Sequence, residues 1–135
     1  MRTVKDVEAY LGRLNRRFKA VDTEPGTFLI SSGEKYPPVA LRVDPPIVLV
    51  RVFIGDAIGG AGAADEVSLY RKLLQYNAKG LVHSSYGLED NRIVLSSALE
   101  LENLDFNELE ATLDEIDLAL AQQVPELAKL SKKNG

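Results

Sequence analysis

The sequence predicts an α+β fold, in which an antiparallel five-stranded sheet packs with three helices in the order α-β-β-β-α-β-β-α. Apolar residues recur with helical spacing in three places, and the stretches between them alternate apolar and polar side chains as strands do. Short turns separate successive strands, which favours antiparallel pairing. Residues 73–127 alone read as the end of a helix, a hairpin and a long capped helix, which make a complete helix-on-sheet half-domain.

The first helix is expected to begin after Thr3, which forms a capping box with Asp6 in place of the usual glutamate. Its apolar side chains follow at alternating steps of three and four residues. The charged face opposite them is typical of a solvated helix surface. The apolar stripe consists of Val4, Val7, Leu11, Leu14 and Phe18.

Three strands are expected next, over residues 27–31, 39–43 and 47–54, separated by polar turns that contain glycine or proline. The third strand is the most apolar run in the chain, because both of its faces are apolar except at Arg51. Such a strand is expected to be covered on two sides, by helices and by either other protein or a partner chain.

A glycine-rich loop, residues 55–64, follows at a strand-to-helix junction, where phosphate-binding loops occur. A P-loop requires a lysine and a hydroxyl residue after its last glycine, but Ala61 and Gly62 follow Gly60. The dinucleotide-binding fingerprint also fails, because Asp65 occupies the position of its third glycine or alanine. The loop is therefore interpreted as a flexible connector.

The second helix carries apolar side chains around more than one stripe between residues 69 and 76, and this breadth predicts packing on two sides. Gly80 is expected to end it, because glycine readily adopts the left-handed conformation of helix stops. Two strands, over residues 81–86 and 92–101, are then expected to form a hairpin around the polar turn 88–91.

The last helix is expected to open at Leu104 and Asp105, where Asp105 and Glu108 form a second capping box. Its apolar stripe continues at helical spacing to Leu120. Pro125 is expected to end or kink this helix. Leu127 and Leu130 add a short tail in this interpretation.

The composition is that of a soluble globular protein, with one domain over residues 1–130 and a frayed tail over 131–135. Twenty acidic residues against 16 basic ones give a net charge of -4, which argues against a nucleic-acid partner. The absence of cysteine excludes disulfides and thiolate metal sites. No apolar run approaches the roughly 20 residues of a membrane span, so no membrane partner is expected and a cytoplasmic location is the default.

His83 is the single histidine and is followed by Ser84 and Ser85. Adjacent residues of a strand point to opposite faces, so His83 and Ser84 cannot form a nucleophile–base pair, and Ser85 has no defined third partner. The acidic residues of the last helix are explained by solvation rather than by a metal. No catalytic residue, cofactor or metal is therefore predicted. The alternative function left open is a small-ligand or phosphate binder, or an enzyme, that uses the glycine-rich loop 55–62 and His83.

The chain resembles the bacterial type III secretion chaperone-like superfamily, which comprises the class I secretion chaperones and their non-secretory relatives. The order of elements matches over nearly the whole chain. The residues that carry the resemblance are packing and turn residues of the second half, in the segments Leu73–Ala78, His83–Leu88, Ile93–Leu95, Leu104–Asp105 and Pro125–Leu127.

This resemblance implies a small acidic homodimer that binds an unidentified client protein, chaperone-like or regulatory, and has no catalytic activity. It places the dimer contact on the second helix, at Tyr70, Leu73, Leu74 and Asn77. It also implies that a client segment binds on the strand over residues 47–54 and at the sheet edge, by filling pockets or by strand addition. The client-binding residues predicted on that strand are Val48, Val50, Val52 and Ile54.

Overall fold

The computed structural model describes residues 1–56 and 63–131, apart from the side chains of 63–65 and 131. It confirms the α+β fold and the antiparallel sheet, which has six strands in the order β1-β2-β3-β4-β6-β5. The described helices are α1 (Val4–Arg13), α2 (Ala63–Gln75), the π-helical turn η1 (Tyr76–Gly80), α3 (Phe106–Gln122) and α4 (Val124–Ser131). The strands are β1 (Phe18–Ala20), β2 (Thr27–Ile30), β3 (Val39–Asp44), β4 (Ile47–Asp56), β5 (Ser85–Glu89) and β6 (Arg92–Glu100).

The sixth strand arises where the first helix was expected to continue. Both bonds of the capping box between Thr3 and Asp6 are present, so the helix begins as predicted. It ends at Arg13, and Asn15 adopts a left-handed conformation with φ of 58° that turns the chain away. Phe18 therefore lies in β1 rather than on α1, and its ring packs edge-on against that of Phe28. Its helical spacing from Leu14 is coincidental.

The fourth helix arises at Pro125. The capping box of Asp105 and Glu108 opens α3 as predicted, and α3 ends at Gln122. Pro125 is the second residue of α4, a first-turn position where its missing N–H costs nothing. Leu127 is buried, so the expected tail is a short helix that packs on the molecule.

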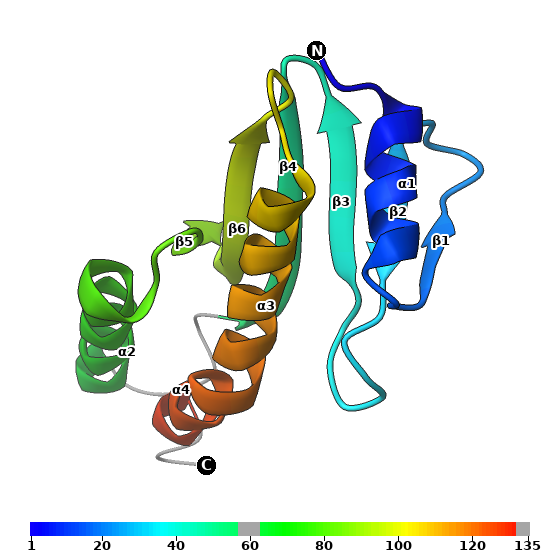
Figure 1. Ribbon diagram of the computed structural model, residues 1–135. Coiled ribbons are helices and arrows are strands. Elements are labelled where there is room, and N and C mark those ends of the chain that lie inside the picture. The colour runs from blue at the N-terminus through cyan, green and yellow to red at the C-terminus, as the bar shows by residue number, and fades with distance from the viewer. Residues whose placement is uncertain (57–62, 132–135) are drawn as a thin grey trace.

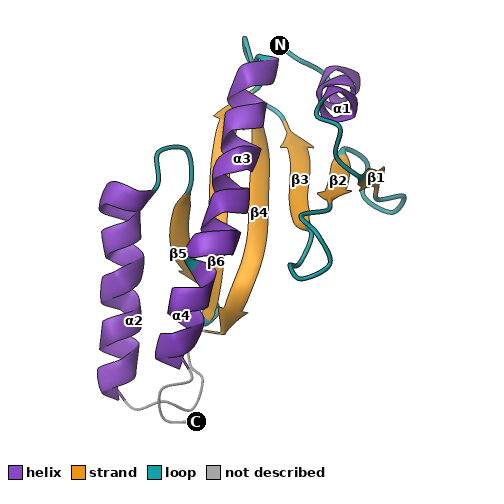
Figure 2. Cartoon of the chain, turned by 60° about the horizontal axis from the view of Figure 1, so that its bottom comes forward, coloured by secondary structure: helices purple, strands orange, loops and turns teal. Residues whose placement is uncertain are grey.

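The helices α1 and α3 cover one face of the sheet, whereas α2 and α4 lie toward the β5 side (Figures 1 and 2). The core lies between that face and the helices, and α3 contributes Leu109, Leu113 and Ile116, each no more than 1% exposed. The opposite face of the sheet has no helix from the described part over it (Figure 2). No helix within residues 1–56 and 63–131 is both long and apolar enough to cross a membrane.

The hairpin of β5 and β6 forms around Asp90 and Asn91, whose φ angles of 50° and 68° are those of a two-residue turn. The hairpin was predicted correctly, but its turn is shorter than the expected 88–91, because β5 runs from Ser85 to Glu89 rather than over 81–86. The N–H groups of residues 82–84 bind the side chain of Glu115 and do not join the sheet.

Candidate protein-binding surfaces

The strand β4 turns most of the predicted client-binding residues inward. Val48, Val50 and Val52 are at most 2% exposed and belong to the core, and Ile54 is half-buried against it. A client could reach the three valines only by displacing that core. An apolar run does not reveal which of its faces is covered. The residues of β4 that lie on the opposite, helix-free face are Ile47, Leu49, Arg51 and Phe53.

This helix-free face combines apolar surface with arginine. Phe53 is 44% exposed and lies between two guanidinium groups, with Arg51 Cζ 5.6 Å and Arg92 Cζ 5.1 Å from the centre of its ring. Arg51 also forms an ion pair with Glu89 of β5. Half-buried Leu49 extends the apolar area along β4. A partner on this face would therefore meet apolar side chains bordered by charges.

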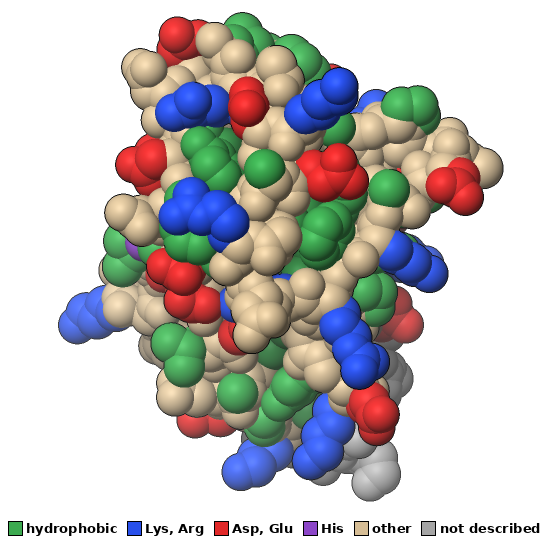
Figure 3. Space-filling model, turned by 45° about the vertical axis from the view of Figure 1, so that its right-hand side comes forward, with side chains coloured by type: hydrophobic (Ala, Val, Ile, Leu, Met, Phe, Trp, Pro, Cys, Tyr) green, Lys and Arg blue, Asp and Glu red, His purple; other side chains and the backbone are tan. Residues whose placement is uncertain are grey.

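A groove of about 360 Å³ lies at the opposite end of the sheet, beside β1. The strand β1 pairs only with β2, so its outer edge carries unpaired backbone groups. Figure 3, turned toward that side of the molecule, shows exposed hydrophobic side chains in small patches between charged ones. The residues that line the groove are Arg17, Phe18, Lys19, Leu29, Ser31, Gly33, Tyr36 and Pro38.

Asn77 binds the other edge of the sheet at Tyr86 of β5. Its side-chain amide donates to the carbonyl of Tyr86 at 3.0 Å and accepts from the N–H of Tyr86 at 2.7 Å. These two bonds occupy the outward-facing backbone groups of Tyr86, so Asn77 blocks strand addition at this position of β5. The described structure has no equivalent side-chain bond on the outer edge of β1, which we regard as the more open of the two edges.

The helix α2 presents an exposed apolar stripe. Val67 is 57% and Leu74 68% exposed, with half-buried Tyr70 between them and exposed Ala78 at the end, at steps of three and four residues. These residues, which we call the α2 stripe, line a shallow groove of about 570 Å³ together with Arg71. An unpaired apolar helix face of this kind is typical of protein–protein contacts.

The predicted dimer residues therefore separate into two groups. Tyr70 and Leu74 lie on the α2 stripe, whereas Leu73 is 5% exposed in the core and Asn77 binds β5. Val67 and Ala78 were missed, although their spacing from Tyr70 and Leu74 could have revealed them. A contact between these residues and a second chain remains a prediction.

Hydrogen bonds connect η1 and β5 to the C-terminal helical segment. The hydroxyl of Tyr76 donates to Glu126 at 2.5 Å, and that of Tyr86 donates to Gln123 at 2.7 Å. Burial raises the pKa of both tyrosines, and the Glu126 carboxylate raises that of Tyr76 further, so both phenols stay protonated. The hydrogen bond from Tyr76 and the charge of Lys72 hold the pKa of Glu126 below its usual value. The end of the α2 stripe is thus held in place by the hydrogen bond between η1 and the C-terminal helix.

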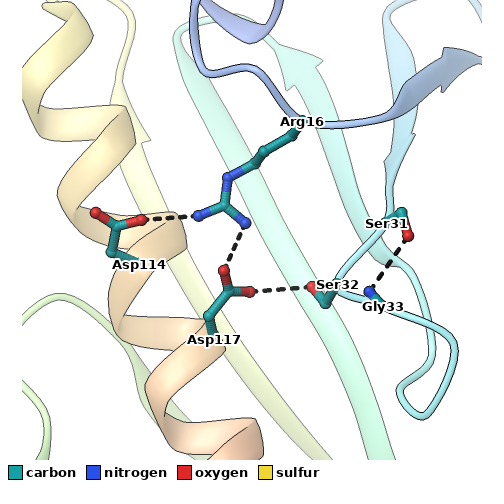
Figure 4. Close-up of polar contacts among 6 residues, drawn as sticks. All are labelled: Arg16, Ser31, Ser32, Gly33, Asp114 and Asp117. Carbon is teal, nitrogen blue, oxygen red and sulfur yellow. Dashed lines mark hydrogen bonds and ion pairs between the residues drawn. The ribbon is translucent and has the colours of Figure 1, made fainter.

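A second polar network joins α3 to the β1 end of the sheet (Figure 4). Arg16 bridges two carboxylates of α3, at 2.6 Å to Asp117 and 2.8 Å to Asp114. The hydroxyl of Ser32, in the loop after β2, donates to the other oxygen of Asp117 at 3.1 Å. This network fixes the segments on both sides of the groove beside β1.

The described start of the glycine-rich loop, at Gly55, lies away from His83. Gly55 pairs with Ile93 on β6, whereas the carbonyl of His83 accepts a bond from Ser97. Four residues of strand, about 13 Å, separate Ile93 from Ser97. Residues 57–62 of the loop lie outside the described part of the chain. Within the described part, no group of three or more histidine and acidic side chains is arranged to hold a metal.

Comparison with known families decides the identity of the fold. Residues 1–133 match the family model CesT_Tir_1. The chain belongs to this family. CesT/Tir-like type III secretion chaperones are non-enzymatic proteins, in agreement with the resemblance recognised in the sequence. No curated protein sequence matches the chain significantly.

Solved structures show the same fold as this CesT/Tir-like chain. A chain of the heterodimeric ExoU–SpcU complex of the Pseudomonas aeruginosa type III secretion system has a TM-score of 0.67 at 17% identity, over 88% of this chain and 95% of that one. YbjN from E. coli, a putative transcription regulator, has a TM-score of 0.63 at 12% identity, over 90% and 93%. The Yersinia pestis secretion chaperone SycH, solved with a fragment of YscM2, has a TM-score of 0.58 at 17% identity, over 93% and 99%.

Proposed function

We propose that this CesT/Tir-like chain is a dimeric chaperone-like protein that binds an extended segment of a client protein. The observation that carries the proposal is that two separate apolar surfaces, the α2 stripe and the groove beside β1, are exposed on one small chain. Two such surfaces allow a second copy and a client to bind at the same time. A cytoplasmic location belongs to the same proposal.

The α2 stripe is the proposed contact between the two copies. An isologous dimer places the same helix of both chains together, so one stripe supplies both halves of the interface. The exposed stripe satisfies this requirement with Val67, Tyr70 and Leu74 near its centre. Leu73 and Asn77 support the stripe from the inside.

The groove beside β1 and the helix-free face are the proposed client site, in place of the buried valines of β4. The free edge of β1 offers backbone groups to an extended segment, and the groove offers room for its side chains. Two of the similar structures were solved as complexes, ExoU–SpcU and SycH with a fragment of YscM2. These complexes support a protein segment as the occupant.

Capture from the lysate of the source organism tests the client site. The tagged wild-type chain should retain one dominant stoichiometric protein, and Tyr36→Ala should reduce its yield at least several-fold, because Tyr36 lines the groove. Leu118→Ala is the matched control, because Leu118 is 57% exposed on α3 and lies away from the groove. Equal capture by all three chains, or background proteins alone, would contradict the proposed client site.

A further inference from the structure

The segment between η1 and β5 is held by one carboxylate of α3. Glu115 accepts hydrogen bonds from three consecutive backbone N–H groups, those of Val82 at 2.8 Å, His83 at 2.9 Å and Ser84 at 2.8 Å. The hydroxyl of Ser84 adds a fourth donor at 2.6 Å. Successive N–H groups that converge in this way form a nest for an anion, and Glu115 fills it.

The same segment is also held from its other side. Ser97 of β6 donates to the carbonyl of His83 at 2.7 Å, and Gln123, the residue between α3 and α4, donates to the carbonyl of Gly80 at 3.3 Å. Leu81 and Ser84 are buried, whereas Val82 is 86% exposed. Residues 82–84 therefore depend on side chains of α3 and β6 rather than on a strand ladder.

The position of this segment sets the position of the α2 stripe. Residues 81–84 follow η1 directly, and η1 contains Ala78, the last residue of the stripe. They then lead into β5, whose edge is bound to Asn77 of η1. A shift of residues 82–84 would therefore move both the end of the stripe and the strand beneath it.

We infer that Glu115 is a positioning residue for the partner-binding surface of α2. It lies on α3, outside the α2 stripe, and it acts by holding residues 82–84 against α3. The inference rests on the proposed dimer through α2. A carboxylate is the group that matches a site with four donors and no cation among its hydrogen-bond partners.

Glu115→Gln tests this role, because the amide keeps the shape of the side chain but loses one acceptor oxygen and the charge. Hydrogen exchange of the amides of residues 82–84 should become at least tenfold faster than in the wild-type chain, and the dimer dissociation constant from sedimentation should rise at least tenfold. Glu110→Gln is the matched control, because Glu110 lies earlier on α3, and the backbone N–H groups of residues 82–84 bind Glu115 instead. It should leave both quantities unchanged.

Glu115→Ala provides an independent test, because it leaves the nest empty. Acetate should restore part of the amide protection and part of the dimer affinity of this variant, compared with chloride at equal ionic strength. Unchanged protection in Glu115→Gln, or lost protection with unchanged dimer affinity, would overturn the positioning role. A monomeric wild-type chain with normal protection of residues 82–84 would instead refute the proposed dimer, and the role of Glu115 with it.

Discussion

Individual carboxylates determine how the segments of this protein are joined. Glu115 supplies hydrogen-bond partners to three N–H groups that no strand satisfies, and the preceding residue, Asp114, binds Arg16 on the other side of α3. The capping carboxylates Asp6 and Asp105 were predictable, because their partners lie three residues away in the sequence. The contact of Glu115 was not, because its donors lie 31 to 33 residues earlier in the chain.

Glu115→Gln is also expected to change how stability depends on pH. Burial raises the pKa of Glu115, but the hydroxyl and N–H donors of residues 82–84 together lower it by a larger amount. The folded pKa therefore lies below the ordinary 4.5. Such a group stabilises the fold fully above pH 4.5, and this contribution is lost as the pH falls through the folded pKa.

Urea unfolding of the wild-type chain and of Glu115→Gln should therefore differ most near pH 7. The difference in free energy of unfolding should shrink in solutions more acidic than pH 4.5. A difference that stayed constant across this range would show that the charge of Glu115 does not stabilise the fold.

Local sequence patterns predict most of the helices and strands, but tertiary contacts determine which face of each element is buried. The apolar run over residues 47–54 predicted a strand, but only its pairing with β3 and β6 and the cover of the helices put Val48, Val50 and Val52 inside. The breadth of α2 predicted packing on two sides; Leu73 packs into the core, whereas Leu74 is exposed, so a contact on the second side stays a prediction. The face of each residue depends on elements distant in sequence, so a run that is apolar on both faces could not show that the valines point into the core.

The neighbouring residues Leu73 and Leu74 are expected to respond differently to truncation. Leu73→Ala should lower the free energy of unfolding by about 2–5 kcal/mol, because it leaves a cavity in the core. Leu74→Ala should change it by less than about 0.5 kcal/mol in dilute solution, because its side chain is 68% exposed. Chemical unfolding of both variants checks this, and a large loss in Leu74→Ala would mean that α2 packs differently.

At the scale of the whole molecule, the sheet separates two surfaces of different character. One edge is covered by Asn77 at Tyr86 and flanked by the α2 stripe, whereas the other edge, β1, is open beside a groove. The helix α3 is bound to segments near both edges of the sheet. Glu115 binds the segment before β5, and Asp114 and Asp117 bind Arg16 before β1. The order of elements predicted the layers, but β1 and η1, which decide the state of the two edges, are too short to produce a periodic signal.

Light scattering of the purified chain tests the proposed dimer most directly. The wild-type protein should have about twice the 14.8 kDa mass of one chain, and Leu74→Glu should have the mass of one chain while staying folded, because a buried charge would separate the two stripes. Leu118→Glu, an equal change at an exposed position of α3, should remain dimeric. A wild-type monomer at high micromolar concentration, or a dimer that survives Leu74→Glu, would contradict the proposed contact through α2.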